Sequence, residues 1–195
     1  MTQRRQERIR TVVSQRQRDL IVVLEDLHDP HNAEAIFRSC DAFGVQQVWL
    51  IFDQEKPFSP KKIGKASSAS ANKWLDFTIF SSTKTALTKL KRAGFELLAT
   101  VIDARGESIF QAQLTQKEKL ALLVGNEYRG LSPVAQELAD RLITIPMRGM
   151  VQSLNVSVAT AIFLFEITRQ RGKTGKNWSL SPEDQVKLVA DFSQR

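Results

Sequence analysis

Short apolar runs rich in β-branched residues alternate with helix-like segments along most of this chain. This alternation limits the possible folds more than any other feature. Strand-like runs are expected at residues 20–24, 45–52, 75–80, 95–102, 120–124 and 142–145. A helix is expected between two of them, at residues 84–93, where Gly94 ends it. Repeated strand–helix units favour a mostly parallel sheet with helices on both faces, so the sequence predicts an α/β fold.

Four further helices are expected. One follows Pro30, with Asn32 as its expected N-cap, and a second covers residues 133–139. A third runs to about Arg171, and Pro182 opens a final amphipathic helix. The intervening residues 53–72 are rich in Lys, Ser, Pro and Gly, which predicts a loop with a short helix near residues 63–71.

The length of 195 residues favours a single domain with short appendages. We expect a basic N-terminal arm or helix over residues 1–19, a core domain over 20–171, and a basic linker and helix over 172–195. The one cysteine, Cys40, excludes an internal disulfide and a cysteine zinc cluster, which favours a reducing compartment. No apolar run is long enough to cross a bilayer, and the Arg-rich start lacks the apolar stretch of a secretory signal. The expectation is a soluble, cytoplasmic protein without a membrane partner.

Positive charge is concentrated in the two flanks. Residues 1–19 hold six arginines against Glu7 and Asp19, and residues 167–178 hold four basic residues and no acid. Each segment contributes +4, which leaves the rest of the chain at −1 of the formal +7. Basic arms on a near-neutral body suit a polyanionic partner, although a purely solubilising arm is the alternative. The arginines expected to contact RNA are Arg4, Arg5, Arg8, Arg10, Arg169 and Arg171.

Residues 145–161, IPMRGMVQSLNVSVATA, pass from the end of an apolar strand through a loop into a helix. A helix that only packs into a core needs one polar cap residue, followed by aliphatic residues. Here Ser153, Asn155 and Ser157 alternate with aliphatic residues, so small polar side chains continue past the cap. This pattern is typical of a ligand pocket, in which backbone amides of the loop and first turn point at the ligand. A well-capped, tightly packed helix is the alternative interpretation.

Two common nucleotide-binding motifs are absent from the sequence. No glycine has another glycine two positions away, which excludes the G-x-G-x-x-G fingerprint, and there is no P-loop. A conventional Rossmann methyltransferase and a kinase are therefore disfavoured.

Three segments together resemble the SpoU branch of the SPOUT RNA methyltransferases. Residues 31–38, HNAEAIFR, resemble the first motif of that family, in which an Asn is followed six residues later by an Arg. Residues 123–132, LVGNEYRGLS, resemble the second, and residues 145–161 resemble the third. The likeness covers about residues 20–171, and the basic flanks are most similar to the TrmH-type tRNA guanosine 2'-O-methyltransferases.

The resemblance implies a deep C-terminal trefoil knot whose loops bind S-adenosylmethionine, and a homodimer packed through the third-motif and C-terminal helices. It implies 2'-O-methylation of RNA ribose, with guanosine 18 in the tRNA D-loop as the favoured target and no role for DNA. Ribosomal RNA is the alternative substrate. A non-catalytic RNA-binding protein is a further alternative, but Arg38, Asn32 and Asn155 are all present. Independently, the helix over residues 154–165 is apolar nearly all round, which predicts burial against a partner subunit.

The resemblance also assigns the site residues. The cofactor loops would contain Ala99, Thr100, Gly125, Asn126, Ile145, Met147, Gly149, Ser153 and Leu154. Most of these follow the carboxyl ends of strands, where ligands bind in open α/β sheets. Ordinary turn chemistry is the alternative explanation for Gly125 and Gly130.

The catalytic residues implied are Arg38, Asn32, Glu127 and Asn155. Arg38 would act as a base helped by an RNA phosphate, or would stabilise the developing alkoxide or grip the phosphate, since a guanidinium normally keeps its proton. Helical periodicity places Arg38 away from the apolar stripe of its helix, which by itself predicts a solvated arginine.

The remaining roles leave alternatives. Asn32 would cap its helix, or orient Arg38 or the ribose. Glu127 would position Arg38, hydrogen-bond Asn32 or accept a proton, unless it is an ordinary surface acid. Asn155 would crosslink the motif loops, and Ser153 would cap its helix while facing the cofactor. His28 and His31 lack further ligands nearby, so we expect loop histidines and no metal site.

Overall fold

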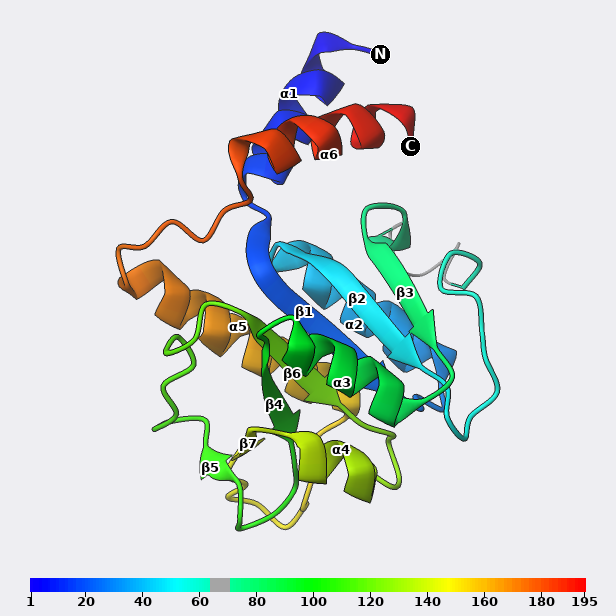
Figure 1. Ribbon diagram of the computed structural model, residues 1–195, viewed down its shortest axis with the longest axis vertical. Helices are drawn as coiled ribbons and strands as arrows, with labels where there is room; N and C mark the ends of the chain where they lie inside the picture. Colours follow the sequence, from blue (N-terminus) through cyan, green and yellow to red (C-terminus); the bar gives the residue numbers. More distant parts are fainter. Residues whose placement is uncertain (64–70) are drawn as a thin grey trace.

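The computed structural model describes residues 1–63 and 71–195. Within these residues the strands form one parallel sheet of seven, in the order β3-β2-β1-β6-β4-β7-β5 (Figure 1). The strands are β1 (Gln17–Glu25), β2 (Val45–Ile51), β3 (Asp76–Phe80), β4 (Glu96–Thr100), β5 (Glu107–Ser108), β6 (Leu120–Val124) and β7 (Arg141–Thr144). Every residue of β6 is buried, as expected for a central parallel strand with both faces covered.

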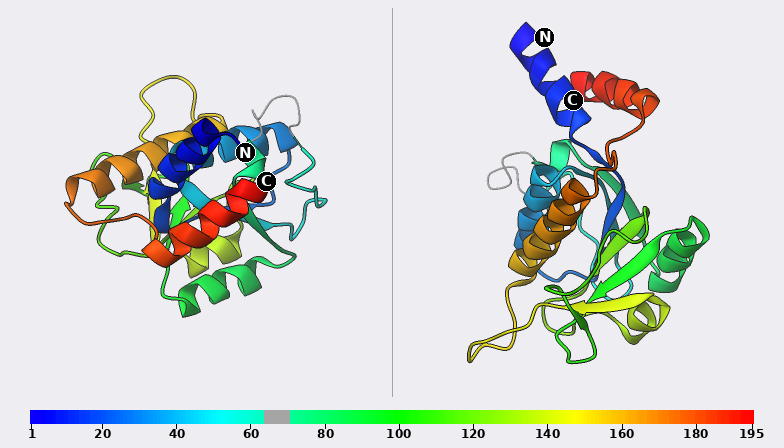
Figure 2. Two further views of the ribbon diagram at one scale, coloured as in Figure 1. Left: turned by 90° about the horizontal axis from the view of Figure 1, so that it is seen from above. Right: turned by 90° about the vertical axis from the view of Figure 1, so that its left-hand side faces the viewer.

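Helices cover both faces of the sheet, and the predicted α/β fold is confirmed. One face carries α2 (Pro30–Ala42) and α5 (Val156–Lys173), which pack against each other; the other carries α3 (Thr83–Arg92) and α4 (Pro133–Leu138) (Figure 2). The two faces have separate apolar cores, one with Phe37 and Phe163, the other with Leu87 and Ala135. The trefoil knot stays a prediction.

The caps of α2 and α5 differ from the sequence prediction. Asp29 is the N-cap of α2, because its side chain accepts a hydrogen bond from the His31 amide at 2.9 Å, and Pro30 takes the first helical position. The prediction that Asn32 caps this helix is wrong, since Asn32 lies inside the first turn. Asn155, not Ser153, is the N-cap of α5 and accepts from the Ser157 amide at 2.8 Å.

The two terminal helices, α1 (Gln3–Ser14) and α6 (Pro182–Gln194), pack on each other beyond the amino ends of the strands (Figures 1 and 2). Ile9 and Val13 of α1 and Leu188 and Phe192 of α6 form their small buried core. The sheet begins at Gln17, slightly before the boundary expected at residue 20. The flanks therefore make one helical unit rather than two separate arms.

Arg171 is a structural residue at the end of α5. It is only 2% exposed, and its guanidinium donates to the side chain of Gln17 and to the carbonyls of Arg18 and Glu118 at 3.0–3.1 Å. Its guanidinium carbon lies 4.3 Å from the centre of the Trp178 ring, and burial lowers the pKa of Arg171 to about 10. The prediction that Arg171 contacts RNA is wrong, because this side chain lies on the same buried stripe of α5 as other core residues, Leu164 and Ile167.

Two sequence predictions concern segments outside the sheet. The short helix expected near residues 63–71 falls largely on residues outside the described ranges, and a 3-10 turn, η1 (Ala71–Lys73), follows them. Within residues 1–63 and 71–195, none of the helices combines the length and the apolar character needed to cross a membrane.

Candidate active site

A cavity of about 300 Å³ lies at the carboxyl ends of the strands. Its walls come from the ends of β4, β6 and β7 and from the loop before α5. The predicted cofactor residues that line it are Thr100, Gly125, Asn126, Ile145, Met147, Ser153 and Leu154. Ala99 is not on the wall, because it is a fully buried strand residue packed into the core under α3 and α4. Gly149 is not on the wall either, and no atom lies within 4 Å of the position that a Cβ would take there.

Gly125 is needed because the chain folds back on itself immediately after β6. A Cβ at this position would lie 2.3 Å from the carbonyl carbon of Gly130 and from the amide nitrogen of Leu131. Asn126 and Gly130 exchange two backbone hydrogen bonds of 3.1 and 2.9 Å across this turn, and Gly130 has a φ of +68°. Turn geometry therefore accounts for both glycines, and the same turn presents its backbone to the cavity.

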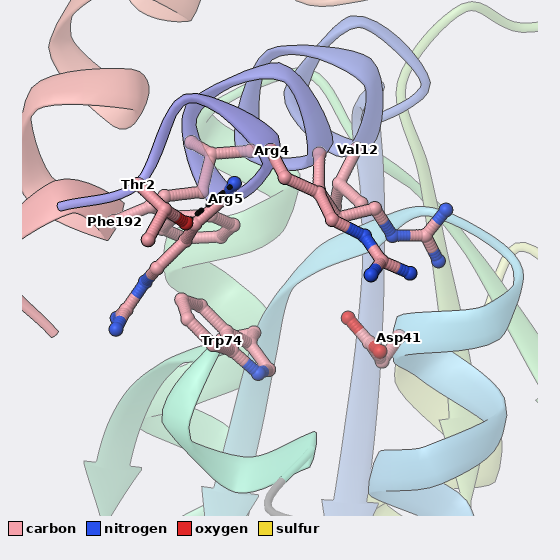
Figure 3. Close-up of a pocket in the computed structure, with 9 residues that line it drawn as sticks. Thr2, Arg4, Arg5, Val12, Asp41, Trp74 and Phe192 are labelled. Carbon is pink, nitrogen blue, oxygen red and sulfur yellow. Dashed lines mark hydrogen bonds between the residues drawn. The ribbon is translucent and has the colours of Figure 1, made fainter.

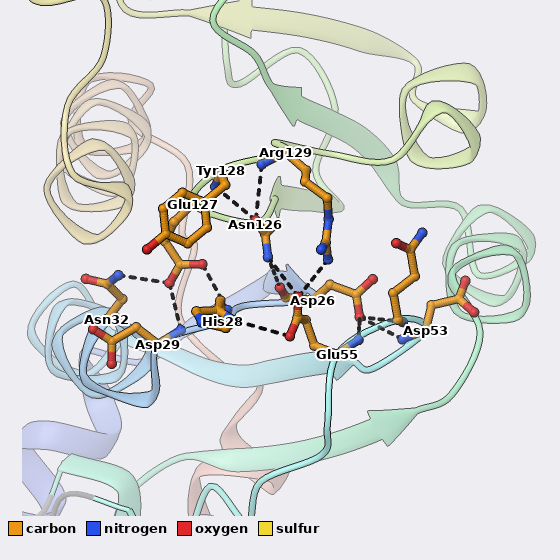
Figure 4. Close-up of polar contacts among 11 residues, drawn as sticks. Asp26, His28, Asp29, Asn32, Asp53, Glu55, Asn126, Glu127, Tyr128 and Arg129 are labelled. Atoms are coloured by element: carbon orange, nitrogen blue, oxygen red, sulfur yellow. Dashed lines mark hydrogen bonds and ion pairs between the residues drawn. The ribbon is translucent and has the colours of Figure 1, made fainter.

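Three predicted catalytic residues form one hydrogen-bonded chain beside the cavity. The Asn155 side-chain amide donates to Asn32 Oδ1 at 3.0 Å, and Asn32 Nδ2 donates to Glu127 Oε1 at 2.8 Å. Glu127 also accepts from the backbone amides of His28 and Asp29, at 2.9 and 3.1 Å (Figure 4). Both the oxygen and the nitrogen of the Asn32 side-chain amide are thus hydrogen-bonded. Residues from all three motifs meet at this place.

These contacts decide between several alternatives. The hydrogen bond between Glu127 and Asn32 is confirmed, and so is the crosslink between motif segments through Asn155. Arg38 lies six residues beyond Asn32 on α2 with an exposed side chain, as helical periodicity predicts.

Comparison with known proteins gives the family. The SpoU rRNA Methylase family model matches residues 19–165, which is most of the chain. The chain belongs to the SpoU methylase family. This confirms the resemblance that the three motifs indicated.

Relatives of this SpoU protein match it over nearly its whole length. The protein from Aquifex aeolicus is 38% identical over 193 residues, covering 98% of this chain and 89% of the relative. The protein from Thermus thermophilus is 39% identical over 196 residues, covering 100% and 98%. Both relatives are named tRNA (guanosine(18)-2'-O)-methyltransferase.

Solved structures give the same family. The crystal structure of the Aquifex aeolicus TrmH/SpoU tRNA-modifying enzyme matches with a TM-score of 0.85 and 35% identity, over 98% of this chain and 95% of the other. The SpoU methyltransferase AviRb from Streptomyces viridochromogenes, in complex with the cofactor AdoMet, matches with a TM-score of 0.69 and 29% identity, over 84% and 62%.

A second polar network, which the sequence analysis does not predict, holds the loops of this candidate site together. Asp26 directly follows β1 with a φ of +51°, and its Oδ1 accepts hydrogen bonds from the backbone amides of residues 53, 54 and 55 at 2.8–3.1 Å. The buried Asn126 donates to the Asp26 carbonyl at 2.7 Å (Figure 4). An Asp directly after an apolar strand is the feature of the sequence that could have indicated this turn, because Asp tolerates the left-handed backbone region better than most residues.

Glu55 joins this network to the loop after β1 and to the turn after β6. Its carboxylate contacts His28 Nδ1 at 3.2 Å and Arg129 Nη2 at 2.8 Å. The hydrogen bond from His28, followed by the pairing with Arg129, holds the pKa of Glu55 below its ordinary value. Tyr128, 84% exposed, lies edge-on to the His28 ring with the ring centres 5.8 Å apart. Within the described residues, no group of three His, Cys, Asp or Glu side chains is placed to hold a metal ion.

The predicted RNA-contacting arginines occupy two surfaces. Arg4, Arg5, Arg8 and Arg10 are all exposed on α1. Arg169 is exposed on α5 and pairs with Glu166 at 2.6 Å, which raises the pKa of Arg169 and lowers that of Glu166. Arg171 alone among the six points into the protein.

Proposed function

We propose that this protein is an S-adenosylmethionine-dependent methyltransferase that modifies the ribose 2'-hydroxyl of guanosine 18 in tRNA. The observation that carries the proposal is the chain of hydrogen bonds from Asn155 through Asn32 to Glu127 beside the cavity. The names of the Aquifex and Thermus relatives, which match over nearly all of this chain, support the reaction and the tRNA target.

The cavity fits the cofactor. Its volume of about 300 Å³ is at the lower end of small-molecule pockets, which cover roughly 300–1,000 Å³. The apolar residues Leu154, Val156 and Phe163 share its wall with residues 125–131, 144, 145 and 147, among which the two glycines can offer only backbone. This combination suits a ligand with a flat adenine, which backbone donors and acceptors can read, and a methionine portion. When bound, S-adenosylmethionine supplies a methyl group on a sulfonium, which is a good leaving group.

The protein's own contribution is to hold the ribose hydroxyl in line with that methyl group and to deal with its proton. Asn32, fixed at both ends of its amide, is a rigid group for orienting the ribose. We assign Arg38 to stabilise the developing alkoxide and to grip the neighbouring phosphate, since a guanidinium keeps its proton at neutral pH. The hydroxyl proton then leaves to solvent water as the oxygen takes up the methyl group. Glu127 acts by positioning Asn32, because both of its oxygens are occupied by protein donors.

We also propose that the protein is a homodimer in the cytoplasm. Phe165 and Val158 of α5 are about half exposed although the helix is apolar on most sides, and we propose that a second copy of the chain covers them. Residues 20–171 would form the catalytic domain, and the helical flanks would hold RNA. The buried free thiol of Cys40 suits a reducing compartment, for which we propose the cytoplasm.

The test uses the purified full-length protein with S-adenosylmethionine and unmodified tRNA transcripts. We expect one 2'-O-methylguanosine per tRNA, at position 18, and none in transcripts with adenosine there. Ribosomal RNA fragments assayed in parallel test the alternative substrate of the same reaction. Methylation of ribosomal RNA with no product on tRNA would contradict the proposed target, and no methyl transfer to either would contradict the proposed reaction.

A further inference from the structure

A second cavity, of about 430 Å³, lies at the other end of the sheet, between α1 and the start of β3 (Figure 3). Arg4, Arg5 and Arg8 of α1 form part of its wall, and Trp74 lies across the cavity from that helix. None of these residues belongs to the active site described above. The cavity is open to solvent, and three cationic side chains and one indole ring share its wall.

The aromatic side of this cavity is rigid. The Trp74 ring packs against Phe192 with the ring centres 5.1 Å apart and a tilt of 58°, and Phe192 itself is buried in the core between α1 and α6. Trp74 is half-buried, so part of its indole still faces the cavity. An aromatic surface held in this way can stack on a flat ligand without a large cost of ordering the side chain.

The charge around the cavity is positive and not neutralised. Asp41 is the acid on the wall, and its carboxylate is already paired with the buried Arg16 at 2.5 Å. In the part of the chain that the structure describes, no carboxylate lies within ion-pair distance of Arg4, Arg5 or Arg8. A ligand that suits this cavity therefore combines a flat apolar ring with negative charge, which describes a nucleotide.

The position of the cavity also favours an RNA strand. Asp41, on its wall, lies three residues after Arg38 on α2, which is about 4.5 Å along the helix axis. A nucleotide in the cavity and a ribose beside Arg38 can thus belong to one continuous strand. Single-stranded RNA is commonly bound in this manner, with bases on aromatic rings and phosphates on basic side chains.

We propose that this cavity binds one unstacked nucleotide of the substrate RNA, with the base on Trp74 and the phosphate held by Arg4 and Arg8. The identity of that RNA as tRNA rests on the proposed function, but the binding chemistry does not. The site would hold the substrate outside the catalytic centre and would favour single-stranded segments over continuous duplex.

Tryptophan fluorescence provides the first test. Trp49 and Trp178 are buried, so Trp74 is the tryptophan that a ligand can reach. An unstructured hexaribonucleotide should quench the emission of the full-length protein, and a blunt duplex of equal length should quench it less. Trp74→Phe should lose the quench while keeping most of the affinity, because a ring remains. Equal quenching in Trp74→Phe would overturn the proposal.

Affinity for the same hexaribonucleotide provides the second test. Trp74→Leu should weaken binding about tenfold, the usual range for loss of one stacking contact. Arg4→Ala combined with Arg8→Ala should weaken binding and lower the log–log salt slope by about 0.7 units, because the two arginines hold one phosphate of a single strand. The matched control is Lys84→Ala with Arg92→Ala, which removes two exposed charges from α3 on another face. An equal loss in the control would contradict a local site.

Trp74→Leu also removes packing against Phe192, so S-adenosylmethionine affinity and circular dichroism are measured on every variant. The surface double variant at Arg4 and Arg8 keeps the test valid if Trp74→Leu fails to fold. These binding measurements do not depend on methyl transfer, so an inactive protein would leave them interpretable. Unchanged binding in the arginine variant, with tRNA methylation intact, would overturn the nucleotide site and leave the proposed function standing.

Discussion

The two ends of the parallel sheet use polar side chains in opposite ways. At the carboxyl end, Asn32, Glu127 and Asn155 bind one another and the surrounding backbone, so each polar group is held in place. At the amino end, Arg4 and Arg8 are exposed and no acid in the described structure pairs with them. The first arrangement suits alignment of reacting atoms, and the second suits attraction of a polyanion. Chemistry and substrate holding are therefore separable by mutation.

The largest effect should come from Arg38→Ala. Loss of a group that stabilises developing charge typically lowers turnover by about 10²–10³-fold, and we expect at least that here. Affinity for S-adenosylmethionine should stay within a few-fold of wild type by calorimetry, since the cavity walls lie elsewhere. Arg92→Ala, an exposed arginine of α3, is the control. Near-normal turnover of Arg38→Ala would remove Arg38 from the catalytic site.

Arg171→Ala should give the next largest effect, on stability. The change leaves several buried oxygen acceptors without a donor and opens space beside Trp178, so we expect a loss of about 3 kcal/mol in the free energy of unfolding. Arg169→Ala, two residues earlier and exposed, should cost less than about 0.5 kcal/mol. Urea denaturation measures both variants. Equal stabilities would show that the buried contacts of Arg171 contribute nothing.

A smaller effect is expected when the charge of α1 is removed without removing the helix. Changing Arg4, Arg5, Arg8 and Arg10 to Gln should weaken tRNA binding and lower the log–log salt slope by roughly 2 to 3 units if three phosphate contacts are lost. Changing the same four arginines to Lys keeps the positive charge, so this variant should keep the salt slope of tRNA binding. Cofactor affinity should not change in either variant. If tRNA affinity and slope are unchanged, α1 is only solubilising.

The smallest effect concerns Cys40, which lies in the core between α2 and the sheet. Burial raises the pKa of its thiol far above the ordinary value, so the group stays protonated and inaccessible up to pH 8 and beyond. Ellman's reagent should therefore react with Cys40 at pH 8 only after denaturant is added. Rapid reaction of the native protein would show that the α2 face opens readily.

The sequence was sufficient for the sheet and most helices because their signals are local. The apolar run at residues 120–124 matches β6, and Pro133 and Pro182 mark the first residues of α4 and α6. The short strand β5 was missed, since two residues carry no periodicity. The cap of α2 differs from the prediction because Asp29, directly before Pro30, is also a good N-cap residue, and it caps the helix in place of Asn32.

For the site, the motif resemblance named three segments that meet beside one cavity, but the partners of each side chain depend on tertiary contacts. Asp26 and Glu55 hold three loops together, yet each is separated from its partners by tens of residues. Arg171 shows the opposite case: composition predicts an exposed arginine in a basic segment, whereas the structure buries this side chain. Arg171 lies on the same helical stripe as the buried Leu164 and Ile167. This spacing predicts burial of Arg171 better than the basic composition of the segment does.

The most direct test of the central claim, methyl transfer to a ribose hydroxyl by the carboxyl-end site, uses tRNA carrying 2'-deoxyguanosine at position 18. We expect no methyl incorporation into this tRNA, binding close to that of the unmodified molecule, and full incorporation into the ribose-containing control. Methyl transfer to the deoxy substrate would show that the 2'-hydroxyl of residue 18 is not the acceptor, and ribose methylation at this site would be excluded.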